Sequence, residues 1–273
     1  MRRLLFSSLA LGLLFTACEP GPVPFGDPDK LLATDVTDID STILSYDAGG
    51  RLILFERYKP SDNSTSFVKP AYRIDRLIAA DFGTSKNDIT HKFKTFEYAS
   101  GGKVLKAYSY EYGLDKYSGY DSLVYNASGH LTAIYVATIT GQGASAGLTQ
   151  KNVFEWDTYY SNIIRKYSIP MRDGTETEDT TVTVYTYDNK VNYIAQQPIL
   201  FNFQMDEPAN ALSRNNVLTA ITTSGGDSEE ISNVYTYDNG DYPISVTTTT
   251  KQLHNGAVVI TSQKSRKLTY VRL

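Results

Sequence analysis

A repeated hexapeptide constrains the fold of this chain more than any other feature. The sequence Val-Tyr-Thr-Tyr-Asp-Asn occurs at residues 184–189 and again at residues 234–239. β-Branched and aromatic residues favour strands and Asp-Asn favours a tight turn, so each copy predicts a strand that runs into a turn. Looser versions recur at four other places: Ser45-Tyr46-Asp47, Phe96-Glu97-Tyr98, Val124-Tyr125-Asn126 and Phe154-Glu155-Trp156-Asp157.

Glycine-containing turns separate these predicted strands. Asp47-Ala48-Gly49-Gly50, Asn126-Ala127-Ser128-Gly129 and Asp238-Asn239-Gly240-Asp241 each precede a new apolar run. Gly, Asn and Asp supply the positive φ that short hairpin turns require. The pattern predicts an all-β fold: consecutive antiparallel hairpins in a large curved or partly closed sheet, with few short helices. The best helix candidates are residues 29–35 and 205–214, and residues 140–149 and 173–180 are predicted loops.

The N-terminus has the features of a targeting segment. Arg2 and Arg3 precede an uncharged run at residues 4–15, which is shorter than the roughly 20 residues that a helix needs to cross a bilayer. Small residues then lead to Cys18, the only cysteine of the chain. This arrangement resembles a bacterial lipoprotein signal, which implies that residues 1–17 are a signal peptide and that Cys18 carries lipid. The alternative is that Cys18 is an ordinary thiol in a secretory signal.

The residues after Cys18 predict a spacer. Residues 19–28 contain four prolines and two glycines, a composition that favours extended chain and cannot pack into a core. At roughly 3.1 Å per residue the spacer would hold a folded domain about 30 Å from a membrane. We therefore divide the chain into a signal peptide (1–17), a lipidated cysteine with its spacer (18–28) and a single antiparallel β domain (29–273).

Charge narrows the classes of partner. The formal net charge is −4, and loss of Arg2 and Arg3 with the signal peptide changes it to −6. A long basic run, which nucleic-acid binding favours, does not occur in the sequence. The sequence therefore predicts no nucleic-acid partner. It predicts contact with a membrane through Cys18.

The sequence contains no strong catalytic or metal-binding motif. His91, His130 and His254 are far apart and lack metal-ligand spacing. Glycine loops that cradle a nucleotide are missing from any strand–helix context. We therefore predict no catalytic residues, no metal and no cofactor. A hydrolase with an unrecognised carboxylate pair remains an alternative, because the separation of two carboxylates depends on the three-dimensional structure.

Aromatic side chains are the candidate binding surface. The chain has 21 tyrosines and one tryptophan, and two groups are dense: Trp156 with Tyr159 and Tyr160, and a second that includes Tyr110 and Tyr112. Aromatic faces are enriched at binding interfaces. The alternative is that these rings form cross-strand ladders that stabilise the sheet.

The motifs together resemble an uncharacterised family of Bacteroidetes putative lipoproteins, whose members carry a domain of unknown function described as porin-like. The matching residues are Tyr185-Thr186-Tyr187-Asp188-Asn189, Ser213-Arg214-Asn215-Asn216-Val217 and Tyr235-Thr236-Tyr237-Asp238-Asn239-Gly240. The resemblance implies a location in the cell envelope and a curled antiparallel sheet. It assigns no activity, so no functional residue is carried over from it.

These observations predict a non-catalytic lipoprotein of the outer membrane. Its expected role is a binding or accessory module for a glycan, a peptide or an outer-membrane partner. A structural envelope protein without a small ligand is the alternative. Residues 180–187 and 245–251 are too rich in threonine for a lipid-facing wall, so we expect a domain in water that is tethered by lipid.

Overall fold

The computed structural model describes residues 30–139, 145–203 and 205–273. The predicted signal peptide, Cys18 and the predicted spacer lie outside these residues. The described chain contains 17 strands in one sheet and two short helices. In chain order the elements are β1 (Lys30–Thr37), β2 (Ser41–Tyr46), β3 (Leu52–Lys59), β4 (Ser64–Arg73), β5 (Arg76–Gly83), β6 (His91–Tyr98), β7 (Val104–Tyr110), β8 (Tyr117–Tyr125), β9 (Leu131–Thr138), β10 (Gly147–Trp156), β11 (Ile163–Arg172), β12 (Thr175–Glu176), β13 (Thr181–Tyr187), α1 (Pro198–Phe201), α2 (Pro208–Leu212), β14 (Val217–Ser224), β15 (Asp227–Tyr237), β16 (Pro243–His254) and β17 (Ala257–Arg272).

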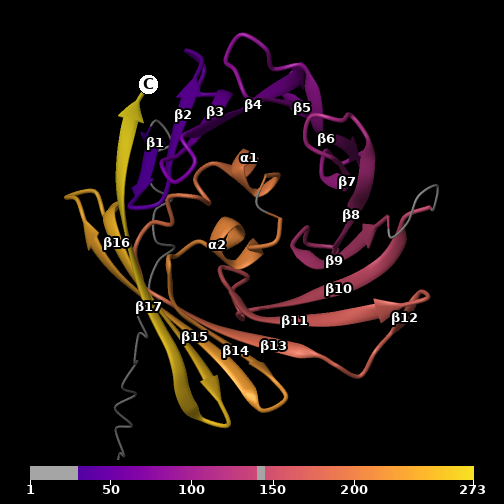
Figure 1. Cartoon of the computed structure of the whole chain (residues 1–273), viewed down its shortest axis with the longest axis vertical. Helices are drawn as coiled ribbons and strands as arrows, with labels where there is room; N and C mark the ends of the chain where they lie inside the picture. Colours follow the sequence, from indigo (N-terminus) through magenta and orange to yellow (C-terminus); the bar gives the residue numbers. More distant parts are fainter. Residues whose placement is uncertain (1–29, 140–144, 204) are drawn as a thin grey trace, which may run out of the picture.

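The strands close into a barrel. Each strand pairs antiparallel with its neighbour in the chain, except that β11 pairs directly with β13 and the two-residue β12 only extends the connecting hairpin. β1 pairs with β2 and also with β17, where Lys30 lies opposite Arg272 and Thr37 opposite Arg266. All strands but β12 therefore form one closed ring (Figure 1). The prediction of antiparallel hairpins is confirmed, but the sheet is fully closed and not just curved or partly closed, because pairing of the first and last strands removes both unpaired edges.

Two of the local predictions were wrong in part. The helix predicted at residues 29–35 is instead the strand β1, because hydrogen bonding to β2 on one side and β17 on the other outweighs a weak local preference. The helix predicted at residues 205–214 is confirmed as the short α2, with Pro208 in its first turn. The loop predicted at residues 173–180 includes β12. Residues 140–144 of the other predicted loop lie outside the described residues, and residues 147–149 belong instead to the strand β10. No helix within the described ranges is long and apolar enough to cross a membrane.

One end of the barrel, here called the tyrosine end, carries the turns that follow β2, β4, β6, β8, β10 and β15, together with Lys30 and Leu273. The opposite end is called the open end. Taken two at a time in chain order, from β1–β2 to β16–β17, the sixteen strands of the ring form eight pairs. In seven of these pairs, an aromatic side chain near the end of the second strand donates a hydrogen bond to a backbone carbonyl near the start of the first strand. The pairs are Tyr46 to Leu32, Tyr72 to Leu52, Tyr98 to Leu77, Trp156 to Leu131, Tyr187 to Ile163, Tyr235 to Val217 and Tyr270 to Pro243.

The acidic residue after these aromatics organises the turn. Asp47 Oδ1 accepts hydrogen bonds from the backbone N–H groups of Gly49 (2.9 Å) and Arg51 (3.0 Å). Gly50 has φ of +80°, which only glycine adopts without strain. Asp238 repeats the arrangement in the turn between β15 and β16. The Tyr-Asp elements of the sequence are therefore strand ends joined to side-chain-capped turns, as the repeat predicts.

The connection between β13 and β14, residues 188–216, enters the barrel and is called the plug. Figure 1 shows α1 and α2 inside the ring of strands. Its apolar side chains, among them Leu200, Phe201 and Ala209, are buried against the inner wall. Burial of a Leu or Phe side chain contributes about 1.5–3 kcal/mol. The plug and the inner wall together form the hydrophobic core.

Polar side chains of the plug fix it to the wall. The Nδ2 of Asn192, a buried residue, donates to the carbonyls of Asn210 (2.7 Å) and Ser213 (2.6 Å). The hydroxyl of Ser213 accepts from the backbone N–H of Ile163 in β11 (3.1 Å), and Asn216 Nδ2 donates to the carboxylate of Asp188. Ser213 and Asn216 belong to the Ser-Arg-Asn-Asn motif that carries part of the family resemblance. In the structure that motif locks the end of the plug to the tyrosine end.

The hydrogen bond from each aromatic side chain to a strand start should contribute measurably to stability. Tyr98→Phe removes the hydroxyl that bonds the Leu77 carbonyl at 2.5 Å. We expect a loss of about 1–2 kcal/mol in the free energy of unfolding, because the carbonyl is left without a partner. Urea denaturation measures the change. Tyr159→Phe, at a ring that is 85% exposed, is the matched control and should change the value by less than about 0.5 kcal/mol; equal losses in the two variants would contradict the assignment.

Candidate functional site: a cup at the open end of the barrel

Two adjoining cavities open at the end of the barrel opposite Lys30 and Leu273. The first has a volume of ≈ 470 Å³ and is lined mainly by aromatic and hydroxyl side chains; it is called the aromatic cavity. The second, of ≈ 360 Å³, is lined by acidic and basic side chains and is called the charged cavity. Phe55 and Arg57 of β3 line both. The two cavities together are called the cup, and side chains of the plug line part of each.

The aromatic cavity is built by side chains from different hairpins. Phe82 ends β5, Phe93 lies in β6 and Tyr112 lies in the turn after β7. The ring of Tyr112 meets Phe82 edge-on at a centroid distance of 4.3 Å and lies 5.4 Å from Phe93. Tyr112 nevertheless remains 62% exposed. One part of its ring is therefore packed while the remainder is available to a ligand.

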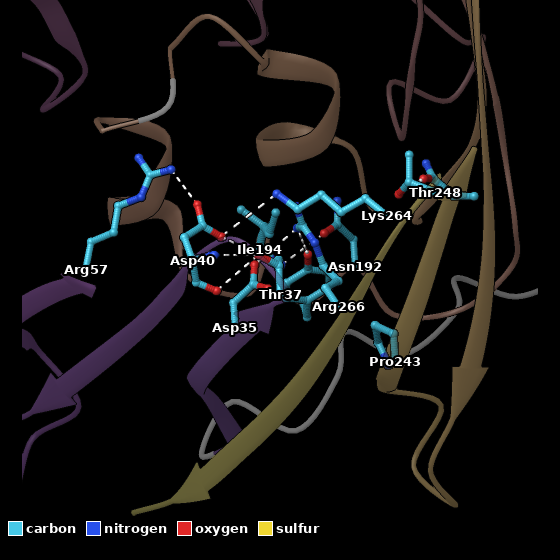
Figure 2. Close-up of polar contacts among 12 residues, drawn as sticks. Asp35, Thr37, Asp40, Arg57, Asn192, Ile194, Pro243, Thr248, Lys264 and Arg266 are labelled. Atoms are coloured by element: carbon cyan, nitrogen blue, oxygen red, sulfur yellow. Dashed lines mark hydrogen bonds and ion pairs between the residues drawn. The ribbon is translucent and has the colours of Figure 1, made fainter. Parts of the chain in front are cut away.

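Asp40 organises the charged cavity, as Figure 2 shows. Its carboxylate accepts a hydrogen bond from Arg57 at 2.5 Å and one from the hydroxyl of Thr37 at 2.6 Å, and Lys264 lies 3.9 Å away. Burial alone would raise the pKa of Asp40, but these hydrogen bonds and the charge of Lys264 outweigh burial and hold the pKa below its usual value. Asp40 is thus a fixed anion that orients the guanidinium of Arg57 between the two cavities.

A second ion pair lies deeper in the charged cavity and joins β1 to β17. Arg266 donates to Asp35 Oδ2 at 3.1 Å and to the hydroxyl of Tyr193, a buried plug residue, also at 3.1 Å. Burial raises the pKa of Asp35, and the charge of Arg266 only partly opposes it. Asp35 Oδ1 has no hydrogen-bond partner among the described residues. The pair therefore connects the barrel seam to the plug while leaving one carboxylate oxygen unused.

Further ionisable groups lie inside the barrel without a salt-bridge partner among the described residues; Lys94 donates only to the Asn202 carbonyl at 3.4 Å, and Glu207 accepts only from Asn210 at 3.5 Å. Burial lowers the pKa of Lys94 on β6, although Asp121 and Asp206 act in the opposite direction. Burial raises the pKa of Asp121 on β8 and of Glu207 at the start of α2. No group of three or more His, Cys, Asp or Glu side chains among the described residues is arranged to hold a metal ion. The lumen thus combines charge with burial and is suited to binding polar ligands.

A third cavity, of ≈ 570 Å³, lies at the tyrosine end between the turns and α1. Its basic side chains are already used by the fold. Arg51 pairs with Asp47 at 2.8 Å and lies over the ring of Tyr72, and Arg76 lies over the ring of Tyr98. These contacts support the rings that make the strand-end hydrogen bonds. The cup is therefore the better candidate for a site with free donors.

The structure separates the aromatic residues selected from the sequence. Trp156 takes the place of a strand-end tyrosine: it is partly buried, and its indole N–H donates to the Leu131 carbonyl at 2.8 Å. Tyr160 stacks on His130 at 4.5 Å, and Tyr159 is exposed in the same turn at the tyrosine end. These three residues are therefore far from the cup.

The second group of selected aromatics lies nearer to the cup. Tyr110 packs against Tyr117 at 6.2 Å, beside Lys92, on the wall. Tyr112 alone among the five selected residues lines a cavity. Sequence reasoning missed Arg57 and Phe82; the alternation of Phe55, Arg57 and Lys59 along one strand face was the available signal. Closure of the barrel determines which hairpins meet at the mouth of the cup, and local sequence patterns do not predict closure.

Comparison with solved structures identifies a similar fold. A crystal structure of a porin-like protein from Bacteroides uniformis aligns with 90% of this chain and 99% of its own, with a TM-score of 0.55 and 11% identity. What the two share is the fold. Two crystal structures of TcdB2–TccC3 assemblies, one with Cdc42, cover 86% and 85% of this chain but only 14% and 16% of theirs, with TM-scores of 0.27 and 0.22. Those two support no argument. No family model and no curated protein matches the sequence.

The anionic state of Asp40 should stabilise the fold in a pH-dependent way. Its folded-state pKa lies below the usual value. The contribution is therefore present above the unfolded pKa, about 3.9, and is lost as the pH falls through the folded pKa. We expect Asp40→Asn to lower the free energy of unfolding by about 1–2 kcal/mol at pH 7, and the difference from wild type to narrow below pH of about 4.

Urea denaturation at pH 7, 5 and 3 measures this effect. Asp38→Asn is the control, because Asp38 is exposed in the same turn. A difference between wild type and Asp40→Asn that stayed constant down to pH 3 would contradict an electrostatic role for Asp40.

Proposed function

We propose that this chain is a non-catalytic envelope lipoprotein whose plugged barrel binds a small polar ligand in the cup. The observation that carries the proposal is the division of the lumen. Residues of the plug pack into the barrel interior, and two adjoining cavities open at the end opposite Lys30, while the cavity at the tyrosine end is lined by basic side chains that the fold already engages. A filled barrel is poorly suited to conduct solutes, and a concave site with a few convergent polar groups is suited to bind one.

The position of the chain termini supports an anchored arrangement. β1 begins at Lys30 at the tyrosine end, and the cup opens at the opposite end. A tether attached before Lys30 would place the tyrosine end toward the membrane and the cup toward water. A lipidated Cys18 followed by the proline-rich spacer would supply such a tether. The proposal therefore locates the protein at the outer membrane, held by lipid.

The outer wall supports a domain that lies in water. On β16 and β17 the buried Val246 and Leu268 face the lumen. The alternate, outward positions pair Ser245 with Lys267, Thr247 with Ser265, and Thr249 with Gln263. A lipid-facing wall carries a continuous apolar band about 25 Å tall. These three outward pairs are entirely polar, so this part of the wall favours tethering over insertion, although single aliphatic side chains such as Ile53, Val184 and Ile221 are exposed on other strands.

The anchor proposal makes a direct prediction for cells of the native host. Cys18→Ser removes the thiol that would be acylated. We expect the wild-type chain to sediment with membranes and to incorporate radiolabelled palmitate, and the variant to lose both properties while remaining soluble. Membrane flotation and autoradiography measure the two outcomes. A variant that still floats with membranes, with no change in palmitate labelling, would refute lipid anchoring through Cys18.

Filling the aromatic cavity should abolish ligand binding without unfolding the barrel. Ser66 of β4 lies opposite Arg57 and lines the cavity, so Ser66→Trp would occupy part of its volume. We expect a panel of oligosaccharides and short peptides to contain a ligand that raises the melting temperature of the wild-type chain and not that of Ser66→Trp. The matched control is Ser45→Trp. Ser45 lies on β2 at an outward position, opposite Leu54 of β3.

The alternative is a structural envelope protein without a small ligand. It gains support from the tyrosine pairs on the wall, such as Tyr108 with Tyr120 at 6.1 Å. If no compound of the panel shifts the melting temperature of the wild-type chain, the structural role is favoured over the binding role. Hydrolysis of a panel glycan that a single carboxylate substitution abolishes would instead support the hydrolase alternative.

A further inference from the structure

The lining of the aromatic cavity has a one-sided charge. Arg57 and Lys59, both on β3, are its ionisable side chains apart from Tyr112, and no carboxylate lies among its lining residues. The acidic side chains of the cup lie in the neighbouring charged cavity. An anionic group that enters the aromatic cavity therefore meets Lys59 and the guanidinium of Arg57, which Asp40 pairs from the side of the charged cavity. This inference rests on the proposed binding function and names the ligand class for the same site.

Both cations retain hydrogen-bond donors for a ligand. Arg57 is held by Asp40 through one terminal nitrogen, at 2.5 Å, and a guanidinium has five N–H donors. Lys59 makes no ion pair with any of the described residues at 4 Å or less. The pKa of the exposed Asp62 carboxyl is lowered first by hydrogen bonds from Ser64, and the positive charge of Lys59 lowers it further. Arg57 is thus oriented, and Lys59 is available at the mouth.

The other lining groups match a hydroxylated ring. Ser66 and Thr84 contribute hydroxyls to the lining of the cavity, and Tyr112, Phe82 and Phe93 contribute aromatic rings. A pyranose presents C–H groups on its face, which pack on aromatic rings, and hydroxyls around its edge, which need hydrogen-bond partners. A volume of ≈ 470 Å³ falls within the range of small-ligand sites, roughly 300–1,000 Å³.

We propose that the aromatic cavity binds an acidic sugar, a hexuronate unit of an oligosaccharide. The sugar ring stacks on the exposed part of Tyr112, and its carboxylate is bound by Lys59 and Arg57. Charge-assisted hydrogen bonds to a carboxylate are stronger than those between neutral groups. The carboxylate therefore provides specificity for the acidic sugar over its neutral equivalent.

The experiment compares an acidic sugar with a form in which methyl groups neutralise its carboxylates. Isothermal titration calorimetry of the full chain in detergent uses trigalacturonate and its methyl ester, in which each carboxylate is neutral. Benzoate tests whether an aromatic carboxylate without hydroxyls is sufficient. We expect trigalacturonate to bind at least about tenfold more tightly than the ester, to weaken as salt is raised from 50 to 500 mM, and benzoate to show no binding.

Variants assign the binding to the cavity. Lys59→Gln should weaken trigalacturonate binding about five- to tenfold and reduce its dependence on salt, and Tyr112→Ala should weaken it at least tenfold. The matched controls are Lys69→Gln, at an exposed lysine of the neighbouring strand, and Tyr159→Ala, at an exposed tyrosine of the tyrosine end. Both controls should bind within about twofold of wild type. Melting temperatures confirm that each variant is folded.

Several results would overturn the inference, and they separate it from the proposed function. Equal affinity for the ester would show that the carboxylate is not recognised, and tight binding of benzoate would show that the sugar ring is not. A loss in Lys69→Gln equal to that in Lys59→Gln would place the site elsewhere. If another compound of the panel binds and Ser66→Trp blocks it while trigalacturonate does not bind, the ligand class is wrong but the binding function stands. If no compound binds at all, both fail.

Discussion

The hydrogen bond from a strand-end aromatic side chain to the backbone carbonyl of the preceding strand start is the interaction on which this structure depends. It occurs in seven of the eight successive strand pairs and always at the tyrosine end. A shift of one residue in strand register would turn every side chain to the opposite face. Because the donor must face the lumen to reach its carbonyl, the bond and the burial of the ring select the same register. Repetition of one local rule thus specifies the register around the whole ring.

The plug depends on this arrangement in turn. It leaves and re-enters the wall at the tyrosine end, where the strand ends are fixed, and Ser213 bonds both the backbone of Ile163 and the hydroxyl of Tyr187. Its apolar side chains supply the core that a wide barrel would otherwise lack. The interior can therefore accommodate ionisable groups that reduce stability, such as Glu207, whose pKa is raised by burial. Glu207 lines the charged cavity, so this destabilising burial occurs at the cup.

Particular residues show how far the sequence predicts this fold. The aromatic residue followed by Asp or Asn, visible at Tyr46, Tyr187 and Tyr237, correctly indicates a strand that ends in a turn. The sequence does not reveal which carbonyl the ring will reach, so Trp156 was read as a candidate binding residue although it occupies a strand-end position. Closure was also beyond local reasoning, because it depends on pairing between β1 and β17, more than 200 residues apart.

The cup was hard to predict for a related reason. Arg57 comes from β3, Phe82 from β5 and Tyr112 from the turn after β7, and the side chains meet only because the strands are ordered around a ring. Their individual patterns are those of ordinary strand and turn residues. Only the spacing of Phe55, Arg57 and Lys59 predicts three side chains on one face of a strand. It does not predict whether that face points into the barrel or out of it.

The cations at the two ends of the barrel therefore differ in whether the fold already uses their charge. At the tyrosine end, cations such as Arg51 and Arg76 are stacked on the rings that fix the strands, so their charges serve the fold. At the open end Lys59 has no such partner among the described residues, and Tyr112 is packed on only part of its ring. A substitution at the tyrosine end removes support from a repeated interaction. At the open end Asp40 and the Asp35–Arg266 pair also support the fold, whereas Lys59 and the exposed part of Tyr112 take no part in the strand-end hydrogen bonds. Substitutions at these two residues therefore change the lining of the aromatic cavity while the strand register stays fixed.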